Sequence, residues 1–168
     1  MEQEIKNRVA DSGIIQIDPK DFIPATTIIK LDIKGWLFEE MILKEKDFRE
    51  HIRRHNWQQY NDAAVAVYCS ADAIIPTWAY KLISEALQLH ASTIFFGNII
   101  QLKEKLTTDA IEKINIENYS NKRIVIKGCG DENFSPGVYM LLTQKLKPVV
   151  KSIMYGEPCS TVPVYKSK

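Results

Sequence analysis

The stretch Ala63-Ala-Val-Ala-Val-Tyr-Cys69 sets the expected fold of this chain. Nearly every position in it is apolar, which is typical of a parallel strand with helices covering both of its faces. Apolar residues then recur at helical spacing from about 75 to 89, and Thr93-Ile-Phe-Phe96 forms another short strand-like run. A strand, a helix and a second strand in this order indicate a βαβ unit.

The same alternation continues toward the C-terminus. The segment 98–118 is expected to be mainly helical, with a break near Thr107, and Arg123-Ile-Val-Ile-Lys127 reads as a strand. Ser135 is a good N-cap, and the proline after it suits a first helical position, so a helix is expected to run to about Leu146.

The two ends of the chain complete the predicted fold. Residues 151–155 and 161–165 should pair as a hairpin, and Pro163 places its last strand at an edge because proline cannot donate to a ladder. Region 1–60 is less regular and either caps the sheet or supplies extra strands, whereas 61–168 is the regular βαβ part. We expect one α/β domain over 1–168. It should be three-layered, with a mostly parallel sheet, right-handed crossovers and a C-terminal antiparallel edge hairpin.

Composition and charge exclude several classes of function. The 168 residues carry 22 basic and 21 acidic side chains, a net charge of +1, so no electrostatic footprint for nucleic acid is present. No apolar run approaches the roughly 20 residues of a membrane span, and the polar N-terminus lacks the core of a signal peptide. We therefore expect a cytoplasmic protein that binds neither nucleic acid nor membrane. A protein partner is possible, and the sequence leaves the oligomeric state open.

The three cysteines are the most informative candidates for chemistry. Cys69, Cys129 and Cys159 each follow a predicted strand, and strands of one parallel sheet would bring all three thiols to its carboxyl edge. Open α/β sheets bind their ligands at that edge. Thiolates suit zinc, Cu(I) or iron, so the sequence predicts a metal site of Cys129, Cys159 and Cys69. A carboxylate (Asp72, Asp131 or Glu132) or a histidine would complete it.

Other interpretations of these residues stay open. A free cysteine often packs as a small apolar side chain, which suits Cys69 at the end of an apolar strand. Cys129 lies between two glycines and ahead of the helix starting at Ser135, where a thiolate would be stabilised, so it is also the candidate nucleophile of an enzyme or sulfur carrier. Asp72 and Asp131 suit helix caps equally well. A third alternative is a binding or scaffold protein with inert thiols.

The histidines and the short motifs narrow the choice further. His51 and His55 share a helix face, but the glutamate of the His-Glu-x-x-His metalloprotease motif is missing, and a polar stripe explains the pair. His90 ends a predicted helix, where a cation is favourable. The chain has no Gly-x-Gly-x-x-Gly, P-loop or Gly-x-Ser-x-Gly pattern, so these nucleotide-binding and serine-hydrolase signatures are missing.

Three segments resemble an uncharacterised bacterial family known only as a domain of unknown function. They are Leu43-Lys-Glu-Lys-Asp-Phe-Arg-Glu50, Cys69-Ser-Ala-Asp-Ala-Ile-Ile-Pro-Thr-Trp-Ala-Tyr80 and Met154-Tyr-Gly-Glu-Pro-Cys-Ser-Thr-Val-Pro-Val-Tyr-Lys166. The resemblance covers nearly the whole chain. It implies a link to iron–sulfur cluster assembly, because genes of this family often lie near assembly genes, and it assigns no catalytic residue.

Overall fold

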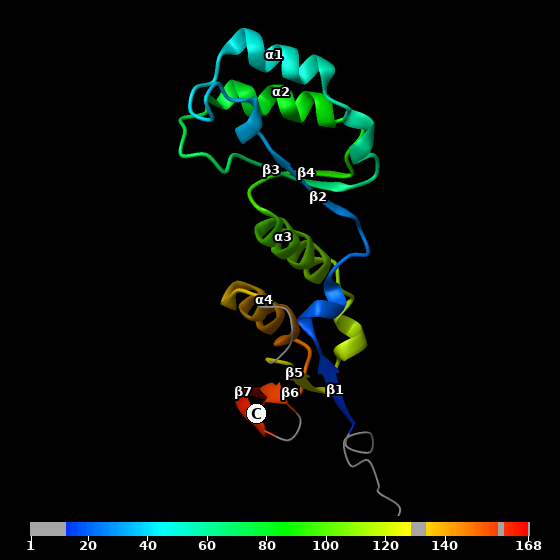
Figure 1. Ribbon diagram of the computed structural model, residues 1–168. Helices are drawn as coiled ribbons and strands as arrows, with labels where there is room; N and C mark the ends of the chain where they lie inside the picture. Colours follow the sequence, from blue (N-terminus) through cyan, green and yellow to red (C-terminus); the bar gives the residue numbers. More distant parts are fainter. Residues whose placement is uncertain (1–12, 129–133, 158–159, 168) are drawn as a thin grey trace, which may run out of the picture. The chain divides into compact units, whose positions relative to one another are not determined.

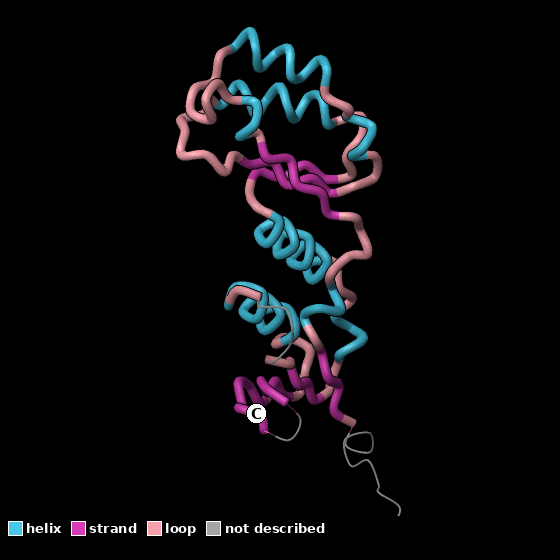
Figure 2. The backbone as a smooth tube through the Cα atoms, in the orientation of Figure 1, coloured by secondary structure: helices cyan, strands magenta, loops and turns pink. Residues whose placement is uncertain are grey.

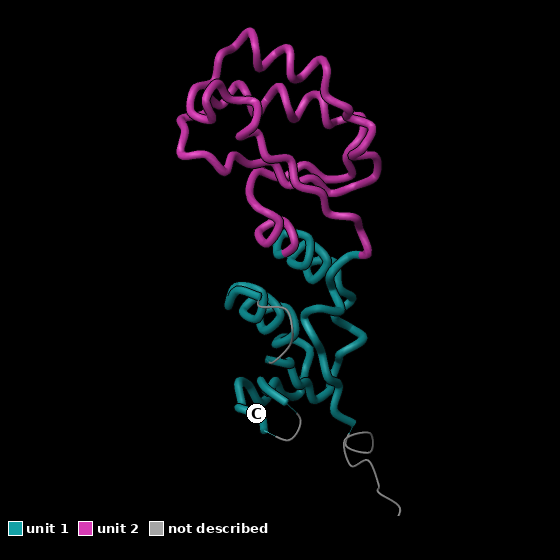
Figure 3. The backbone as a smooth tube through the Cα atoms, in the orientation of Figure 1, with its two compact units in different colours: residues 1–24, 104–168 teal, residues 25–103 magenta. Residues whose placement is uncertain are grey.

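A computed structural model describes residues 13–128, 134–157 and 160–167 of the chain. The chain divides into two compact units (Figure 3). Unit 1 combines residues 1–24 with 104–168, and unit 2 consists of residues 25–103. The second boundary falls inside helix α3 (Ile99–Glu112).

Unit 2 contains a three-stranded parallel sheet in the order β2-β3-β4. Its strands are β2 (Ile28–Asp32), β3 (Ala64–Tyr68) and β4 (Thr93–Phe96). Helix α1 (Glu45–Arg54) connects β2 to β3, and helix α2 (Thr77–Leu87) connects β3 to β4. Both helices lie on the same side of this sheet (Figure 1). When two crossover connections have the same handedness and proceed in the same direction across a sheet, their helices lie on the same side of it.

The core of unit 2 lies between this sheet and its helices. Val65 and Val67 of β3 pack with Ile83 and Leu87 of α2. Phe48 of α1 is fully buried in the same cluster. All of β3 except its last residue is buried, so the strand predicted from its continuous apolar sequence is confirmed.

Unit 1 contains a four-stranded sheet in the order β1-β5-β6-β7. Its strands are β1 (Ile14–Ile17), β5 (Arg123–Ile126), β6 (Ser152–Glu157) and β7 (Ser160–Lys166). The first three are parallel, and β7 pairs antiparallel with β6. Helix α4 (Pro136–Leu146) connects β5 to β6, and Figure 2 shows this alternation of strand and helix.

The core of unit 1 combines the strands with α4 and the later part of α3. Its buried members are Ile17, Ile111, Ile124, Ile126, Val138, Leu142, Leu146, Val150 and Ile153. Ser135 caps α4 and Pro136 occupies its first position, as predicted. Leu142 and Leu146 are one helical turn apart, so both face the sheet.

The α/β class, the parallel strands and the C-terminal antiparallel hairpin are confirmed, and β7 with Pro163 is an edge strand. The expectation of one sheet is wrong, because the strands divide between two sheets. The N-terminal third supplies a strand to each, β1 to one and β2 to the other. Sequence patterns indicate which residues form strands, but the pairing of strands depends on contacts across the chain.

Two further segments differ from a simple alternation of strand and helix. Residues 37–43 form neither a helix nor a strand. A short 3-10 turn (Lys34–Trp36) is followed by an isolated bridge between Phe38 and Ile42. Helix α3 has no break near Thr107, which is buried inside it. Further 3-10 turns are Pro19–Phe22, Trp57–Tyr60 and Ile116–Tyr119. In the described part of the chain, no helix combines the length and the apolar character needed to span a membrane.

A single cooperative domain stays a prediction, and the distribution of tryptophan makes it testable. Trp36, Trp57 and Trp78 are the only tryptophans, and all three belong to unit 2. Because α3 runs through the boundary, we expect the urea midpoint from tryptophan fluorescence to coincide with that from far-ultraviolet circular dichroism, which reports both units. Phe48→Ala should lower both midpoints together. Two separated transitions would contradict a single domain.

Candidate functional site

The carboxyl edge of the unit 1 sheet gathers the ends of three parallel strands. Ile17 at the end of β1 lies opposite Ile126 at the end of β5, and Ile126 lies opposite Tyr155 of β6. The backbone N–H of Lys127 continues the ladder by donating to the carbonyl of Ile17 at 2.9 Å. Residues that follow these strands therefore leave the sheet at one edge, where α/β sheets bind ligands.

A carboxylate between two ammonium groups occupies the β1 side of this edge. Asp18 is only 9% exposed, and its Oδ1 accepts a hydrogen bond from the backbone N–H of Lys20 at 3.1 Å. Its Oδ2 lies 3.4 Å from Lys20 Nζ and 3.5 Å from Lys127 Nζ. Among the described residues this buried oxygen has no hydrogen-bond partner. The charges of the two lysines compensate the charge of this buried carboxylate.

Two tyrosines and a glycine occupy the β6 side. The Tyr155 hydroxyl donates to the carbonyl of Gly128 at 3.5 Å, a long hydrogen bond. A Cβ at Gly128 would come within 2.3 Å of the Tyr155 ring, so only glycine permits this approach. Tyr139 of α4 meets Tyr155 edge to face at a centroid distance of 5.5 Å. The segment immediately before Cys129 is thus packed against β6.

The start of α4 is secured by side-chain hydrogen bonds. Ser135 Oγ accepts from the backbone N–H of Gly137 at 3.2 Å and donates to the Glu104 carboxylate. The cap connects α4 to α3 within unit 1.

Cys129, Asp131 and Cys159 lie outside the described residues, as does Glu132. In the chain, Cys129 directly follows Gly128, and Cys159 directly precedes Ser160, the first residue of β7. Their meeting at the unit 1 edge therefore stays a prediction.

Cys69 and Asp72 belong to the other unit. Cys69 follows β3, a strand of the unit 2 sheet, so the prediction that all three cysteines share one sheet edge is wrong. Cys69 is half-buried beside the unit 2 core and is a free thiol, and Asp72 is exposed. The error follows from the strand pairing, because β3 pairs with β2 and β4 and not with β5.

Asp32 organises the carboxyl edge of unit 2. Its carboxylate accepts hydrogen bonds from the backbone N–H of Lys34 at 3.0 Å, from the backbone N–H of Ser70 at 3.0 Å and from Ser70 Oγ at 2.6 Å. Burial alone would raise the pKa of Asp32, but the hydrogen bonds from Ser70 and Lys34 outweigh it and hold this pKa below its usual value. The ends of β2 and β3 are therefore joined by an ionised carboxylate.

Two groups near Cys69 have raised pKa values. The hydrogen bond and charge of Glu40, 2.8 Å away, raise the pKa of Lys34, and the Cys69 thiol adds to this effect. Burial raises the pKa of the Tyr80 hydroxyl, again with a contribution from Cys69. The raised pKa values favour the protonated amine of Lys34 and the protonated phenol of Tyr80.

His51 of α1 and His55, the C-cap residue of that helix, belong to an aromatic cluster. His51 stacks on Trp36 at a centroid distance of 5.7 Å, and His55 meets Trp57 at 4.8 Å. His55 Nε2 also lies 2.9 Å from the Tyr60 hydroxyl. Burial, followed by the charge of His51, lowers the pKa of His55. The pair packs as aromatic rings, an arrangement that the polar stripe in the sequence does not indicate.

Within the described ranges, no three histidine, cysteine, aspartate or glutamate side chains lie close enough to hold a metal ion. Sequence reasoning missed Asp18, Lys127 and Tyr155 as residues of the unit 1 edge. Asp18-Pro19 signalled only the end of a strand. Only the pairing of β1 with β5 shows that Asp18 lies beside Lys127.

Residues 3–167 match the protein family described as "Protein of unknown function (DUF2480)". The chain belongs to this family. The match spans nearly the whole chain and confirms the resemblance to a family of unknown function. No curated protein and no solved structure matches the chain. The family description assigns no activity, so we infer a function from the residues at the two sheet edges.

Replacing Asp32 with alanine should destabilise the protein. Ser70 and Lys34 would lose a charged acceptor, and bonds to charged groups contribute about 1.5–3 kcal/mol each in favourable cases. Because the site is partly exposed, we expect a total loss of about 1–3 kcal/mol in the free energy of unfolding. Urea unfolding followed by tryptophan fluorescence measures it. Asp72→Ala, at an exposed carboxylate of the same unit, should change it by less than about 0.5 kcal/mol.

His55 should make stability depend on pH. Its pKa is lower in the folded protein than the roughly 6.5 of an unfolded chain, so the unfolded state takes up the proton first. The contribution is complete above about pH 6.5 and is lost as the pH falls through the folded pKa. We expect a lower urea midpoint at about pH 5.5 than at about pH 7.5. His55→Gln should reduce this difference, whereas an equal difference in His55→Gln and His90→Gln would refute the assignment.

Proposed function

We propose that this protein binds zinc or iron through thiolates at the carboxyl edge of the unit 1 sheet. The proposed ligands are Cys129 and Cys159, with Asp131 as a carboxylate ligand. The observation that supports the proposal is the parallel pairing of β5 with β6, in which Ile126 lies opposite Tyr155. Neighbouring strands are roughly 4.8 Å apart, so the segments that carry the two cysteines leave one edge from adjacent strands.

Asp18 follows β1, the strand on the other side of β5. We leave it out of the ligand set, because the ammonium groups of Lys20 and Lys127 already compensate its carboxylate and would repel a metal ion. Two thiolates and a carboxylate leave one position of a four-coordinate ion for a further ligand. We leave Cys69 and Asp72 out of the site, because the shared sheet edge that grouped them with the other cysteines does not exist.

The choice of zinc or iron follows from the ligands. Thiolates favour these metals over magnesium or calcium, which prefer oxygen ligands. We propose a cytoplasmic location, where a reducing environment keeps the thiols available. Iron bound in this way would suit a step of iron–sulfur cluster assembly, the process with which the family resemblance associates the chain.

The test is elemental analysis of protein purified without a metal-affinity tag. We expect close to one zinc or iron per chain in the wild type. Cys129→Ser and Cys159→Ser should each lose most of it, because each removes a thiolate ligand. Cys69→Ser is the matched control and should keep the metal. Loss of metal in Cys69→Ser alone would overturn the assignment of the site to unit 1.

Substoichiometric metal in the wild type and in Cys129→Ser alike would contradict metal binding. Iodoacetamide labelling then separates the two alternatives. If Cys129 is labelled at acidic pH faster than a free-thiol model compound, it is an activated nucleophile. This result is expected for a thiolate ahead of the capped helix α4. Slow labelling would favour a scaffold with inert thiols.

A further inference from the structure

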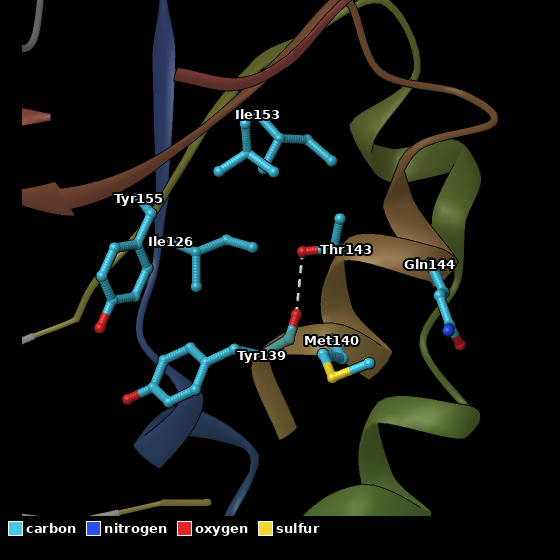
Figure 4. Close-up of a pocket in the computed structure, with 8 residues that line it drawn as sticks. Ile126, Tyr139, Met140, Thr143, Gln144, Ile153 and Tyr155 are labelled. Atoms are coloured by element: carbon cyan, nitrogen blue, oxygen red, sulfur yellow. Dashed lines mark hydrogen bonds between the residues drawn. The ribbon is translucent and has the colours of Figure 1, made fainter. Parts of the chain in front are cut away.

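A pocket of about 400 Å³ lies in unit 1 beside α4, on the face of the sheet formed by β5 and β6. Ile126 and Ile153 of the sheet and Tyr139 and Met140 of α4 line it (Figure 4). Val164 of β7 completes the apolar wall. All of these residues belong to unit 1, so the pocket is formed within one compact unit.

The size of the pocket decides the kind of occupant. Small-molecule sites typically measure roughly 300–1,000 Å³, and this pocket falls within that range. Eight residues line it, whereas each side of a stable protein interface uses roughly 20–30 residues. The pocket therefore suits a small molecule better than the surface of a second protein.

The chemistry of the lining decides the class of that molecule. None of the eight lining residues carries a charge, so an ionised group bound among them would lose its hydration without gaining a counter-ion. Met140 is 61% exposed and Val164 is 51% exposed, so apolar side chains remain in contact with solvent at the mouth of the pocket. Covering them with an apolar group is favourable.

One end of the pocket is polar. The rings of Tyr139 and Tyr155 meet there edge to face, and their hydroxyls point to the same side (Figure 4). Among the described residues, the Tyr155 hydroxyl makes one long hydrogen bond, at 3.5 Å to the carbonyl of Gly128, which it can exchange for a shorter one to a ligand. The Thr143 hydroxyl, by contrast, is bound to the carbonyl of Tyr139 at 2.9 Å.

We propose that this pocket binds a neutral, mainly apolar small molecule, with an aromatic or branched aliphatic body beside Ile126, Ile153 and Met140 and one hydrogen-bond acceptor directed at Tyr155. None of the lining residues is a proposed metal ligand, and the inference does not depend on the metal site.

Fluorescence titration with the neutral probe N-phenyl-1-naphthylamine tests the proposal. The full-length wild type should bind the probe saturably at about one site per chain. Met140→Glu and Val164→Glu place a charge in the apolar wall and should each raise the dissociation constant about tenfold or more. Both positions are more than half exposed, which favours folding of the variants, and circular dichroism verifies it. Leu89→Glu, at a 90% exposed position outside the pocket, is the matched control and should bind like the wild type.

Three results would overturn the proposal. The first is no saturable binding to the wild type, or equal affinity in Met140→Glu, Val164→Glu and the control. The second is equal or tighter binding of 1-anilinonaphthalene-8-sulfonate, a comparable aromatic probe with a fixed negative charge, which would contradict a neutral ligand. The third is a dimer in sedimentation velocity that Met140→Glu dissociates, which would identify the pocket as a contact between copies of the chain.

Discussion

The parallel pairing of β1 with β5 is the constraint on which the arrangement of the chain depends. Ile14 lies opposite Arg123, so the N-terminal strand enters a sheet whose other strands come from the last third of the sequence. All of unit 2 lies in the chain between these two strands. Parallel strands need a long connection, and here that connection contains a complete α/β unit. The same pairing places Asp18 beside Lys127.

Each sheet has a carboxyl edge with its own polar centre. In unit 2 the Asp32 carboxylate joins β2 to β3 through hydrogen bonds from the backbone N–H groups of Lys34 and Ser70 and from the Ser70 hydroxyl. In unit 1 the Asp18 carboxylate is held by the ammonium groups of Lys20 and Lys127 at 3.4 and 3.5 Å. Both carboxylates are therefore used by the fold. The functional proposal rests instead on the pairing of β5 with β6, the strands that precede Cys129 and Cys159 in the chain.

Each helix or strand was predictable to the extent that apolar patterns and capping residues within a few positions determine it. The apolar run of β3 and the Ser135-Pro136 start of α4 were predicted because burial and capping act over a few residues. The segment 36–43 has no clear hydrophobic periodicity. It contains the end of a 3-10 turn and the bridge between Phe38 and Ile42, and Glu39 and Glu40 between these two residues adopt positive φ. Histidine is a polar residue type, so the sequence pattern did not indicate that His51 and His55 pack against Trp36 and Trp57.

By itself the sequence determined the α/β class, the strands from residue 63 onward, the C-terminal hairpin and the position of each cysteine after a strand. These features depend on side-chain period, turn residues and caps, which are properties of short segments. Only the tertiary structure decided that the strands divide into two sheets, and hence that Cys69 follows a strand of a different sheet from those preceding Cys129 and Cys159. Strand partners are chosen by contacts between residues far apart in the chain, and no local pattern encodes that choice.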